Sequence, residues 1–299
     1  MDLNGRVALI TGGSRGVGAA TAIKLARHGC NVAINCNQSL DLANKVAEEC
    51  QSLGVKALVV KGDVASNLDC IKMLSETVQS FGQLDILINN AGVTRFINFQ
   101  NLDDVKDEDW DRIMGVNLKG PFQCARAARQ FLESSEIGVI VNTASVAGIT
   151  GVGSSIPYCA SKAGVINLTL ALARTFGPKI RVNAVAPGFI EGEWLKKGLG
   201  ESYEEVRNKK AQEGLLDKVS KPEDIADGIF SMIICRKVTG QILTVDTGHT
   251  IGPRIGVGIY VSINLLPVQL SFIHWCILQI VWPIVEAFRS NKTVVSQLL

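Results

Sequence analysis

The feature that most constrains the fold is a regular alternation of short apolar runs with longer amphipathic segments. Seven apolar runs fit strands, at residues 7–10, 32–34, 57–60, 86–88, 138–142, 180–185 and 241–245. Helical patterns separate them, at residues 16–28, 40–53, 67–81, 108–131, 158–176 and 222–235. Continuous apolar runs, rather than alternating ones, are typical of parallel strands covered on both faces by crossover helices. The sequence therefore predicts a single doubly wound, Rossmann-type α/β domain with a mostly parallel seven-stranded sheet.

Two segments depart from the simple alternation. Gly120-Pro121 interrupts the pattern at 108–131 and predicts two separate helices there, because proline disrupts a helix interior. Residues 189–216 are charged and carry little apolar periodicity, which suits a lid over a ligand site. We find no internal repeat and no linker within residues 1–253.

Charge divides the chain into a balanced body and an apolar extension. The 299 residues include 30 Lys and Arg and 28 Asp and Glu, yet only three of these bases and one of these acids lie beyond residue 253. No charged residue occurs from Ile255 to Val285. We therefore expect a domain at 1–253 and a hydrophobic C-terminal extension at 254–299. The net charge of +2, without a long basic run, argues against a nucleic-acid partner.

The extension admits three interpretations. It is long enough to span a bilayer, although its polar residues and two prolines are unfavourable in hydrocarbon. It also fits an apolar strap docked on the domain or on a neighbouring subunit, or a non-native extension of the reading frame. The N-terminus lacks an apolar signal sequence, and the eight cysteines form no CxxC pair. These features predict a cytoplasmic protein with free thiols, with membrane association through residues 255–285 as the alternative.

A glycine-rich turn follows the first strand and predicts a dinucleotide site. In Thr11-Gly12-Gly13-Ser14-Arg15-Gly16-Val17-Gly18, three glycines lie between a strand and a helix. Gly12 permits the tight turn, Gly16 lets the backbone approach a pyrophosphate, and Gly18 permits close packing of helix and strand. The helix N-terminus offers free N–H groups and a positive dipole to phosphate.

The end of the second strand bears on the choice of cofactor. NAD enzymes place an acidic residue there against the ribose 2′-hydroxyl. Here the strand ends Ile34-Asn35-Cys36-Asn37-Gln38, and the guanidinium of Arg15 is available for a 2′-phosphate. NADP is therefore the expected cofactor, and a solvated Arg15 with a site that also accepts NAD is the alternative.

Tyr158 and Lys162 stand four residues apart, on one face of a predicted helix. A phenol has a pKa near 10, and a nearby ammonium lowers it by stabilising phenolate. Ser145 follows the fifth strand, at the sheet edge where ligands bind in open α/β folds. The three residues predict acid–base chemistry at that edge.

With these residues the chain resembles the short-chain dehydrogenase/reductase family, over about residues 3–253. Besides the glycine turn and the Ser145, Tyr158 and Lys162 set, the motifs carrying the resemblance are Asp63-Val64, Asn89-Asn90-Ala91-Gly92, Asn117 and Pro187-Gly188. The resemblance implies that Tyr158 donates a proton to a carbonyl or accepts one from an alcohol. It implies that Lys162 lowers the pKa of Tyr158 and holds the nicotinamide ribose, and that Ser145 hydrogen-bonds the substrate oxygen. Asn117 would hold a water in a proton relay.

The resemblance also implies a cofactor-binding set. Asp63 and Val64 would contact the adenine, Asn89 would lie along the cofactor, and the backbone from Pro187 to Ile190 would flank the carboxamide. The full set consists of Gly12, Ser14, Arg15, Gly16, Val17, Gly18, Asn37, Asp63, Val64, Asn89, Ala91, Gly92, Tyr158, Lys162, Pro187, Gly188 and Ile190. No metal site is expected, because the three histidines lie in no ligand-like cluster.

The resemblance implies an NADP(H)-dependent oxidoreductase that interconverts a ketone and a secondary alcohol, similar to the 3-oxoacyl-carrier-protein reductase branch. A sugar or polyol dehydrogenase using NAD, and a catalytically silent nucleotide-binding scaffold, are the alternatives. Expected partners are a small carbonyl or alcohol substrate and further copies of the chain, as a dimer or tetramer through helices near Asn117–Leu132 and Tyr158–Phe176.

Three stretches depart from the family pattern: Glu191-Gly192, Thr247-Gly248 and the acidic Glu133-Ser134-Ser135-Glu136. Thr247 stands where the family usually has the first of two glycines. The acidic stretch argues against docking of an acidic carrier protein.

Overall fold

The computed structural model describes residues 1–252, and Met1–Pro253 form one compact unit. Its centre is a seven-stranded sheet in the order β3-β2-β1-β4-β5-β6-β7, with every neighbouring pair parallel. The strands are β1 Val7–Ile10, β2 Asn31–Cys36, β3 Ala57–Lys61, β4 Ile86–Asn89, β5 Val139–Thr143, β6 Arg181–Pro187 and β7 Ile242–Val245. The predicted fold class is confirmed, and the sheet is parallel throughout. The expected extension at 254–299 lies outside the described residues.

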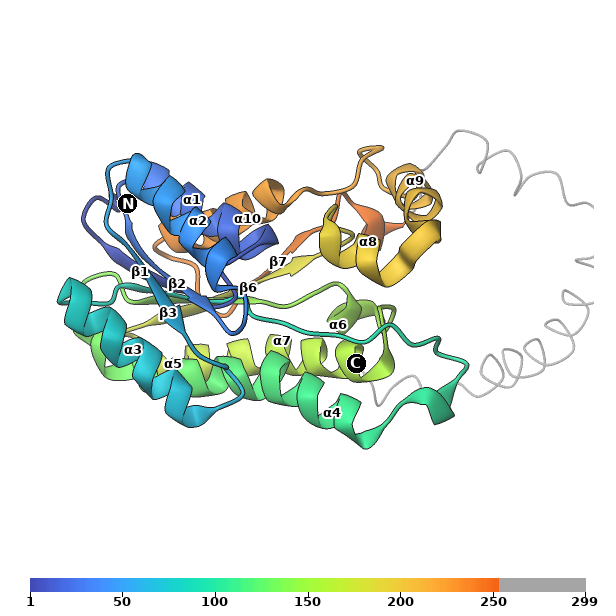
Figure 1. Ribbon diagram of the computed structural model, residues 1–299, viewed down its shortest axis with the longest axis horizontal. Helices are drawn as coiled ribbons and strands as arrows, with labels where there is room; N and C mark the ends of the chain where they lie inside the picture. The colour runs from blue at the N-terminus through green and yellow to red at the C-terminus, as the bar shows by residue number, and fades with distance from the viewer. Residues whose placement is uncertain (253–299) are drawn as a thin grey trace, which may run out of the picture. The chain divides into compact units, whose positions relative to one another are not determined.

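Helices cover both faces of the sheet (Figure 1). Helices α1, α2 and α10 lie on one face, and α3, α5 and α7 on the other. The α-helices are α1 Gly16–Arg27, α2 Leu40–Ser52, α3 Asn67–Phe81, α4 Asp107–Met114, α5 Gly120–Glu133, α6 Ala147–Thr150, α7 Ile156–Phe176, α8 Glu193–Leu199, α9 Tyr203–Glu213 and α10 Pro222–Ile234. Short 3₁₀ turns lie at η1 Leu102–Asp104, η3 Gly200–Ser202 and η4 His249–Ile251, and a π-helical turn at η2 Gly115–Lys119.

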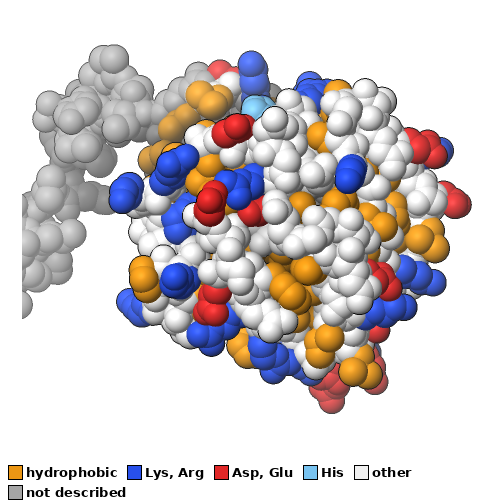
Figure 2. Space-filling view, turned by 90° about the vertical axis from the view of Figure 1, so that its left-hand side faces the viewer, with side chains coloured by type: hydrophobic (Ala, Val, Ile, Leu, Met, Phe, Trp, Pro, Cys, Tyr) orange, Lys and Arg blue, Asp and Glu red, His pale blue; other side chains and the backbone are white. Residues whose placement is uncertain are grey.

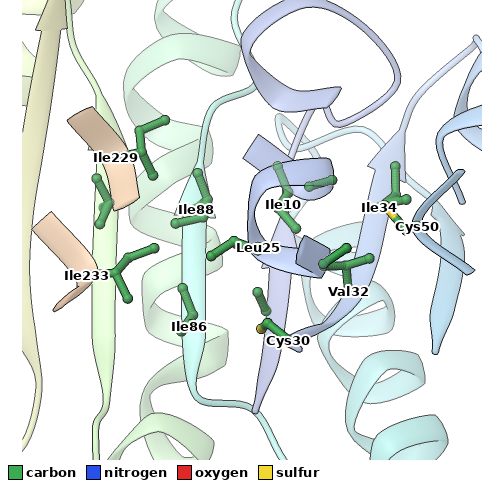
Figure 3. Packing of buried hydrophobic residues seen from close by; sticks show 14 of the residues in the cluster. Ile10, Leu25, Cys30, Val32, Ile34, Cys50, Ile86, Ile88, Ile229 and Ile233 are labelled. Atoms are coloured by element: carbon green, nitrogen blue, oxygen red, sulfur yellow. The ribbon is translucent and has the colours of Figure 1, made fainter. Parts of the chain in front are cut away.

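The core consists of two apolar layers, one on each side of the sheet. Side chains alternate along β1, so that Ala8 and Ile10 face the α1 and α10 layer while Val7 and Leu9 face the α3 and α5 layer. Figure 3 shows the first layer, in which Leu25 of α1 and Ile229 of α10 meet the strands. Each fully buried Leu or Ile stabilises the fold by about 1.5–3 kcal/mol, which explains why these runs are apolar throughout.

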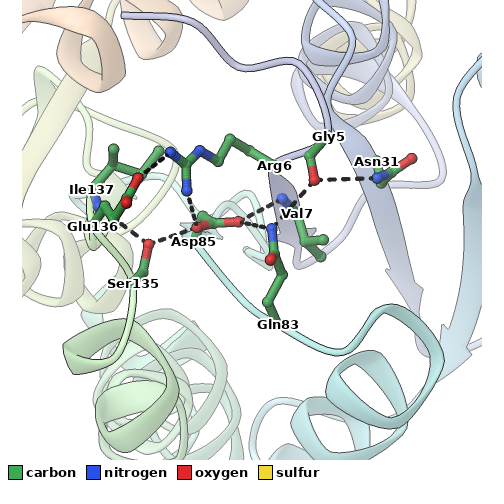
Figure 4. Close-up of polar contacts among 9 residues, drawn as sticks. All are labelled: Gly5, Arg6, Val7, Asn31, Gln83, Asp85, Ser135, Glu136 and Ile137. Carbon is green, nitrogen blue, oxygen red and sulfur yellow. Dashed lines mark hydrogen bonds and ion pairs between the residues drawn. The ribbon is translucent and has the colours of Figure 1, made fainter.

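A polar network closes the amino ends of the central strands (Figure 4). The buried carboxylate of Asp85 accepts hydrogen bonds from the Val7 N–H at 2.9 Å, Gln83 at 2.8 Å and Ser135 at 2.6 Å. Arg6 lies 3.4 Å from Asp85 and 2.6 Å from Glu136. The network joins β1, β4 and the segment before β5 at the edge opposite the glycine turn, so it holds the sheet without entering the site.

The region around Gly120-Pro121 differs from the prediction of two separate helices. Helix α4, the π-helical turn and α5 follow one another without a break, and Pro121 lies in the first turn of α5. A π turn widens the helix by one residue, and a proline at the start of a helix removes no required hydrogen bond. The chain therefore passes this proline without separating the two helices.

The surface shown in Figure 2 carries Lys and Arg side chains interspersed with Asp and Glu, with hydrophobic side chains in small groups between them. Among the described residues, α7 alone is long and apolar enough to cross a membrane. It packs against α6, β6 and α4 and carries Tyr158 and Lys162, so its apolar composition fits a core helix.

Candidate active site

The site lies where the strand order reverses. Strands β1 and β4 are adjacent, and the connections leaving them run in opposite directions across the sheet, which opens a crevice at their carboxyl ends. The glycine turn leaves β1 at this edge, the Asn89–Gly92 loop leaves β4, and Ser145 follows β5. Residues far apart in the sequence therefore meet at one edge of the sheet.

Two asparagine side chains hold the glycine turn. Asn35 Oδ1 accepts the Gly12 N–H at 3.1 Å, and Asn90 Nδ2 donates to the carbonyl oxygens of Thr11 at 3.0 Å and Gly12 at 3.1 Å. Neither side chain was among the predicted site residues, although Asn90 belongs to the Asn89-Asn90-Ala91-Gly92 motif. The position of Asn90, directly after β4, could have indicated this role. A side-chain amide there can donate to and accept from the backbone of the neighbouring loop at the same time.

The glycines of this turn leave space that a side chain would fill. A Cβ on Gly12 would lie 2.8 Å from Ala91 Cα, and a Cβ on Gly18 would strike the carbonyl oxygen of Gly12. Gly16 has a φ of +53° with nothing within 4 Å of a would-be Cβ, so its backbone is open at the N-terminus of α1. Ser14 and Val17 flank this opening and are half-buried. The turn fits a dinucleotide pyrophosphate in geometry and in donor set.

The end of β2 forms a second polar group beside the turn. Arg15 is exposed and donates from Nη2 to Ser39 Oγ at 2.5 Å. Ser39 immediately precedes α2, and sequence reasoning missed it because its loop carries no recognisable motif. Cys36 is buried, and Asn37 donates to Asp63 Oδ2 at 3.2 Å. The guanidinium of Arg15 and the hydroxyl of Ser39 thus meet where the ribose end of a dinucleotide is expected, and the Asn37 amide pairs with Asp63.

Asp63 is held in place by its neighbours. Arg112 lies 2.7 Å from Asp63 Oδ2, and the Ala65 N–H donates to Oδ1 at 2.9 Å. Partial burial opposes ionisation, but the Ala65 and Arg112 contacts outweigh it and keep the pKa of Asp63 below its ordinary value. Val64, next in the chain, is buried and accepts from Gln123 at its carbonyl, 2.8 Å away.

Ser145, Tyr158 and Lys162 come together at the centre of this edge. Ser155 caps α7 by accepting the Tyr158 N–H at 3.4 Å, which fixes the first turn of the helix. One turn further on, Lys162 Nζ lies 5.7 Å from the centroid of the Tyr158 ring and donates to the Thr143 carbonyl at 2.7 Å. Tyr158 also has a hydrogen bond with Ser145. All three side chains are at least 90% buried.

Burial controls the ionisation of this group. Burial raises the pKa of Tyr158 to about 12, with the Ser145 hydrogen bond acting in the opposite direction. Burial also lowers the pKa of Lys162 to about 8. The expected lowering of the Tyr158 pKa by Lys162 is therefore not found in this structure. The Lys162 ammonium is engaged by the Thr143 carbonyl, and desolvation of the phenol dominates.

Asn117 lies inside the π-helical turn between α4 and α5. Its Oδ1 accepts the Val93 N–H at 2.8 Å, and its Nδ2 donates to the Val93 carbonyl at 2.9 Å and to Ser161 Oγ at 3.1 Å. A Cβ on Gly92 would lie 3.6 Å from Asn117 Oδ1 and 3.8 Å from Lys162 Nζ, so Gly92 separates these two groups. The Asn117 side chain thus ties the loop after β4 to α7.

The Asn89 side chain does not point along the crevice, where the cofactor was expected to lie. Its side chain is buried and donates to Asn142 Oδ1 at 2.9 Å and to the Pro121 carbonyl at 3.3 Å. Asn142 in turn donates to Thr169 Oγ1 at 2.9 Å. The side chain therefore connects β4 to β5 and α5, while the residues that follow, Asn90 to Gly92, face the glycine turn and Lys162.

The backbone after β6 closes the far side of the site. The Pro187 carbonyl accepts the Val146 N–H at 3.0 Å, and the Gly188 N–H donates to the Val245 carbonyl at 3.0 Å. Ile190 forms an isolated bridge with Ser220, at the base of the lid. The predicted lid, residues 189–216, contains the two helices α8 and α9.

Comparison with known proteins assigns these features to one family. The family profile described as "short chain dehydrogenase" matches residues 6–201. The chain is 36% identical over 244 residues to the 3-oxoacyl-[acyl-carrier-protein] reductase of Staphylococcus aureus, a match covering 81% of this chain and 96% of the relative. It is 36% identical over 256 residues to an uncharacterised oxidoreductase of Thermotoga maritima, covering 84% of this chain and 99% of the relative. A short-chain dehydrogenase from Burkholderia cenocepacia, solved in complex with NADP, superposes with a TM-score of 0.76 at 33% identity, covering 84% of this chain and 100% of that one.

Proposed function

This chain belongs to the short-chain dehydrogenase/reductase family and is an NAD(P)-dependent oxidoreductase, and we propose that it reduces a ketone to a secondary alcohol with NADPH at neutral pH. The observation that carries the proposal is the buried group formed by Ser145, Tyr158 and Lys162 at the carboxyl edge of the sheet. With a pKa of about 12, Tyr158 is protonated at neutral pH and is ready to donate a proton. Reduction of a carbonyl needs that proton at the oxygen.

Each residue of the group has a separate task. The nicotinamide, when bound, supplies the hydride that the protein itself lacks. Tyr158 donates its phenolic proton to the carbonyl oxygen of the substrate as negative charge develops there. Ser145 directs a hydroxyl to the same oxygen and stabilises that charge. Lys162, which is cationic below pH 8 and donates to the Thr143 carbonyl, would hold the nicotinamide ribose. Asn117 holds the loop after β4 against α7. We also propose that Asn117 holds a water molecule of the proton relay.

The cofactor we propose is NADP rather than NAD. The glycine turn would receive the pyrophosphate at the N-terminus of α1, and Arg15, Ser39 and Asn37 would receive the 2′-phosphate. A charge-assisted pair between a guanidinium and phosphate is among the strong polar contacts. The absence of a carboxylate at residues 35–38 removes the group that would repel a 2′-phosphate. The NADP complex of the Burkholderia cenocepacia relative supports this choice.

A free ketone suits the surface better than one attached to a carrier protein. The Staphylococcus aureus relative is named for a 3-oxoacyl group on a carrier protein. On α5 of this chain, Arg129 pairs with Glu133 at 2.7 Å, and Arg126 binds Asn67 at 2.6 Å. Glu136, near the end of α5, pairs with Arg6. These bases are already engaged, so we propose a 3-oxoacyl-like or other ketone substrate free in solution.

A panel of ketones and alcohols, followed through NADPH and NADH absorbance, tests the proposal. We expect NADPH-dependent reduction at pH 7 that is abolished in Tyr158→Phe, while NADPH affinity measured by fluorescence stays within about threefold of the parent chain because only the dissociable proton is removed. Substantial turnover in the Phe variant would refute the Tyr158 assignment. Tight NADPH binding without reduction of any ketone would favour the nucleotide-binding scaffold.

A further inference from the structure

Two aromatic side chains pack against Tyr158, and a third packs against one of them. Trp194, in the first turn of α8, lies 6.1 Å from the Tyr158 ring centroid at an interplanar angle of 60°. Phe96, in the loop after β4, lies 6.5 Å from Trp194 at 68°. Phe99 packs against Tyr158, Cys159 and Ala147. Edge-on contacts at these distances are favourable for aromatic pairs. We call Phe96, Phe99 and Trp194 the aromatic wall.

The wall is fixed to the scaffold at its base. The loop that carries Phe96 is anchored by the Ile97 N–H, which donates to the Ser154 carbonyl at 2.9 Å, and by Thr94 Oγ1, 2.6 Å from Ser154 Oγ. On the lid side, the Phe96 ring lies against the backbone of α8 at Gly198. A Cβ on Gly198 would fall within the ring. The lid therefore meets the site through a helix position that only glycine leaves open.

Large apolar side chains are exposed on α8, on α6 and just after α6. Trp194 is 49% exposed, Ile149 is 53% exposed and Val152 is 70% exposed. The charged residues next to the wall in the chain are engaged elsewhere, since Arg95 pairs with Asp109 at 2.7 Å and Glu193 with Lys196 at 3.1 Å. Large exposed apolar side chains around a site point to an apolar ligand.

Resting on the function proposed above, we propose that the substrate is a neutral ketone with a flat apolar ring beside its carbonyl, and that Trp194 selects it by packing against that ring. A ring placed there would cover the exposed part of Trp194 and would need no counter-ion. Trp194 is then a specificity-determining residue rather than a packing residue of the lid.

Two ketones that differ by one fused ring test the inference. β-Tetralone carries a benzene ring fused to a six-membered cyclic ketone, and cyclohexanone lacks it. We expect the parent chain with NADPH to favour β-tetralone by about tenfold or more in kcat/KM, from the apolar area of the added ring. Trp194→Ala should reduce this preference about tenfold through KM, while kcat/KM for cyclohexanone changes less than about threefold.

Matched variants separate recognition from lid packing. Trp194→Phe keeps a ring and should keep most of the preference. Trp110→Phe, at a similarly exposed Trp on α4, should change neither substrate. Gly198→Ala ordinarily favours a helix, but here its methyl group would displace Phe96 and should raise KM for β-tetralone selectively. NADPH binding and circular dichroism confirm that each variant is folded.

The outcomes distinguish this inference from the proposed function. If Trp194→Ala lowers kcat/KM equally for both ketones, Trp194 only packs the lid and the inference is wrong while ketone reduction stands. Faster reduction of acetoacetyl-CoA than of β-tetralone by the parent chain also overturns it, because that substrate is anionic. If the parent chain binds NADPH and reduces no ketone, the proposed function fails, and the substrate class fails with it.

Discussion

Replacing Lys162 by methionine should stabilise the fold while it abolishes turnover. Lys162 is buried, and burial lowers its pKa from 10.5 to about 8. At 1.36 kcal/mol for each pKa unit, holding this cation inside the protein at pH 7 costs about 3.4 kcal/mol. Methionine has similar length and no charge, so the variant avoids this cost.

The hydrogen bond to the Thr143 carbonyl opposes part of the gain. Its length is 2.7 Å, and a hydrogen bond to a charged group contributes about 1.5–3 kcal/mol. The net increase in the free energy of unfolding at pH 7 is therefore about 0.5–2 kcal/mol. For a domain of this size that corresponds to a rise in Tm of about 2–6 °C.

The pH dependence identifies the cause. Below pH 8 the lysine is charged in both states, so the full cost is present in the parent chain. Between about 8 and 10.5 the unfolded chain still holds the proton that the folded chain has released, so the stability of the parent chain rises with pH. The advantage of Lys162→Met should therefore shrink over this window.

Urea unfolding at pH 7 and pH 10 measures the effect, with Lys197→Met as the control because Lys197 is an exposed lysine on α8. The reasoning would be refuted if Lys162→Met were less stable than the parent chain at pH 7. It would also be refuted if the difference in unfolding free energy between the two chains did not change with pH. NADPH-dependent ketone reduction, measured on the same samples, should be lost only in Lys162→Met.

Three further predictions follow from the same site and its surroundings. Alcohol oxidation should accelerate as the pH rises above neutrality because it needs the phenolate, and a pH profile in which oxidation is fastest below pH 7 would contradict the raised Tyr158 pKa. Ser39→Ala and Arg15→Ala should each weaken NADPH binding more than NADH binding, as measured by fluorescence titration. Asn37→Asp should reverse the preference by repelling the 2′-phosphate. A parent chain that prefers NADH would exclude the proposed 2′-phosphate site. Thr247 has a φ of 58°, a left-handed conformation that strains a β-branched residue by about 1–2 kcal/mol. Thr247→Gly should therefore raise Tm by about 2–4 °C, after the entropic penalty of glycine is subtracted. A lower Tm would argue against that strain.

The fold was predictable because its determinants are local. Continuous apolar runs specify buried parallel strands, and Gly29, Gly54 and Gly82 adopt positive φ at or just beyond the ends of α1, α2 and α3. Right-handed crossovers and a glycine turn after β1 then limit the possible strand orders to a few. The π-helical turn before Pro121 was not predictable, because it depends on a backbone register that no single residue type encodes.

Side-chain direction limited what the sequence could say about the site. The Asn89-Asn90 pair reads as one motif, yet Asn89 ends β4 and faces the interior, whereas Asn90 follows the strand and faces the glycine turn. Asn35, Ser39 and the aromatic wall come from separate elements and are brought to this edge of the sheet only by the topology. The ionisation of Tyr158 depends on how completely the surrounding elements exclude water, which no local spacing can indicate.

The chemistry of the residues that hold the site follows from the same energetics. The loops at the carboxyl edge are fastened by neutral amides, with Asn35 and Asn90 on the glycine turn, Asn117 on the loop after β4, and Asn89 with Asn142 beneath. An amide both donates and accepts, so it can join two backbone segments without the desolvation cost of an ion. Among residues 1–252 this leaves Lys162 as the one buried Lys or Arg. Burial raises the pKa of Tyr158 and lowers that of Lys162, so any process that changes the solvation of the crevice changes the ionisation of both groups together.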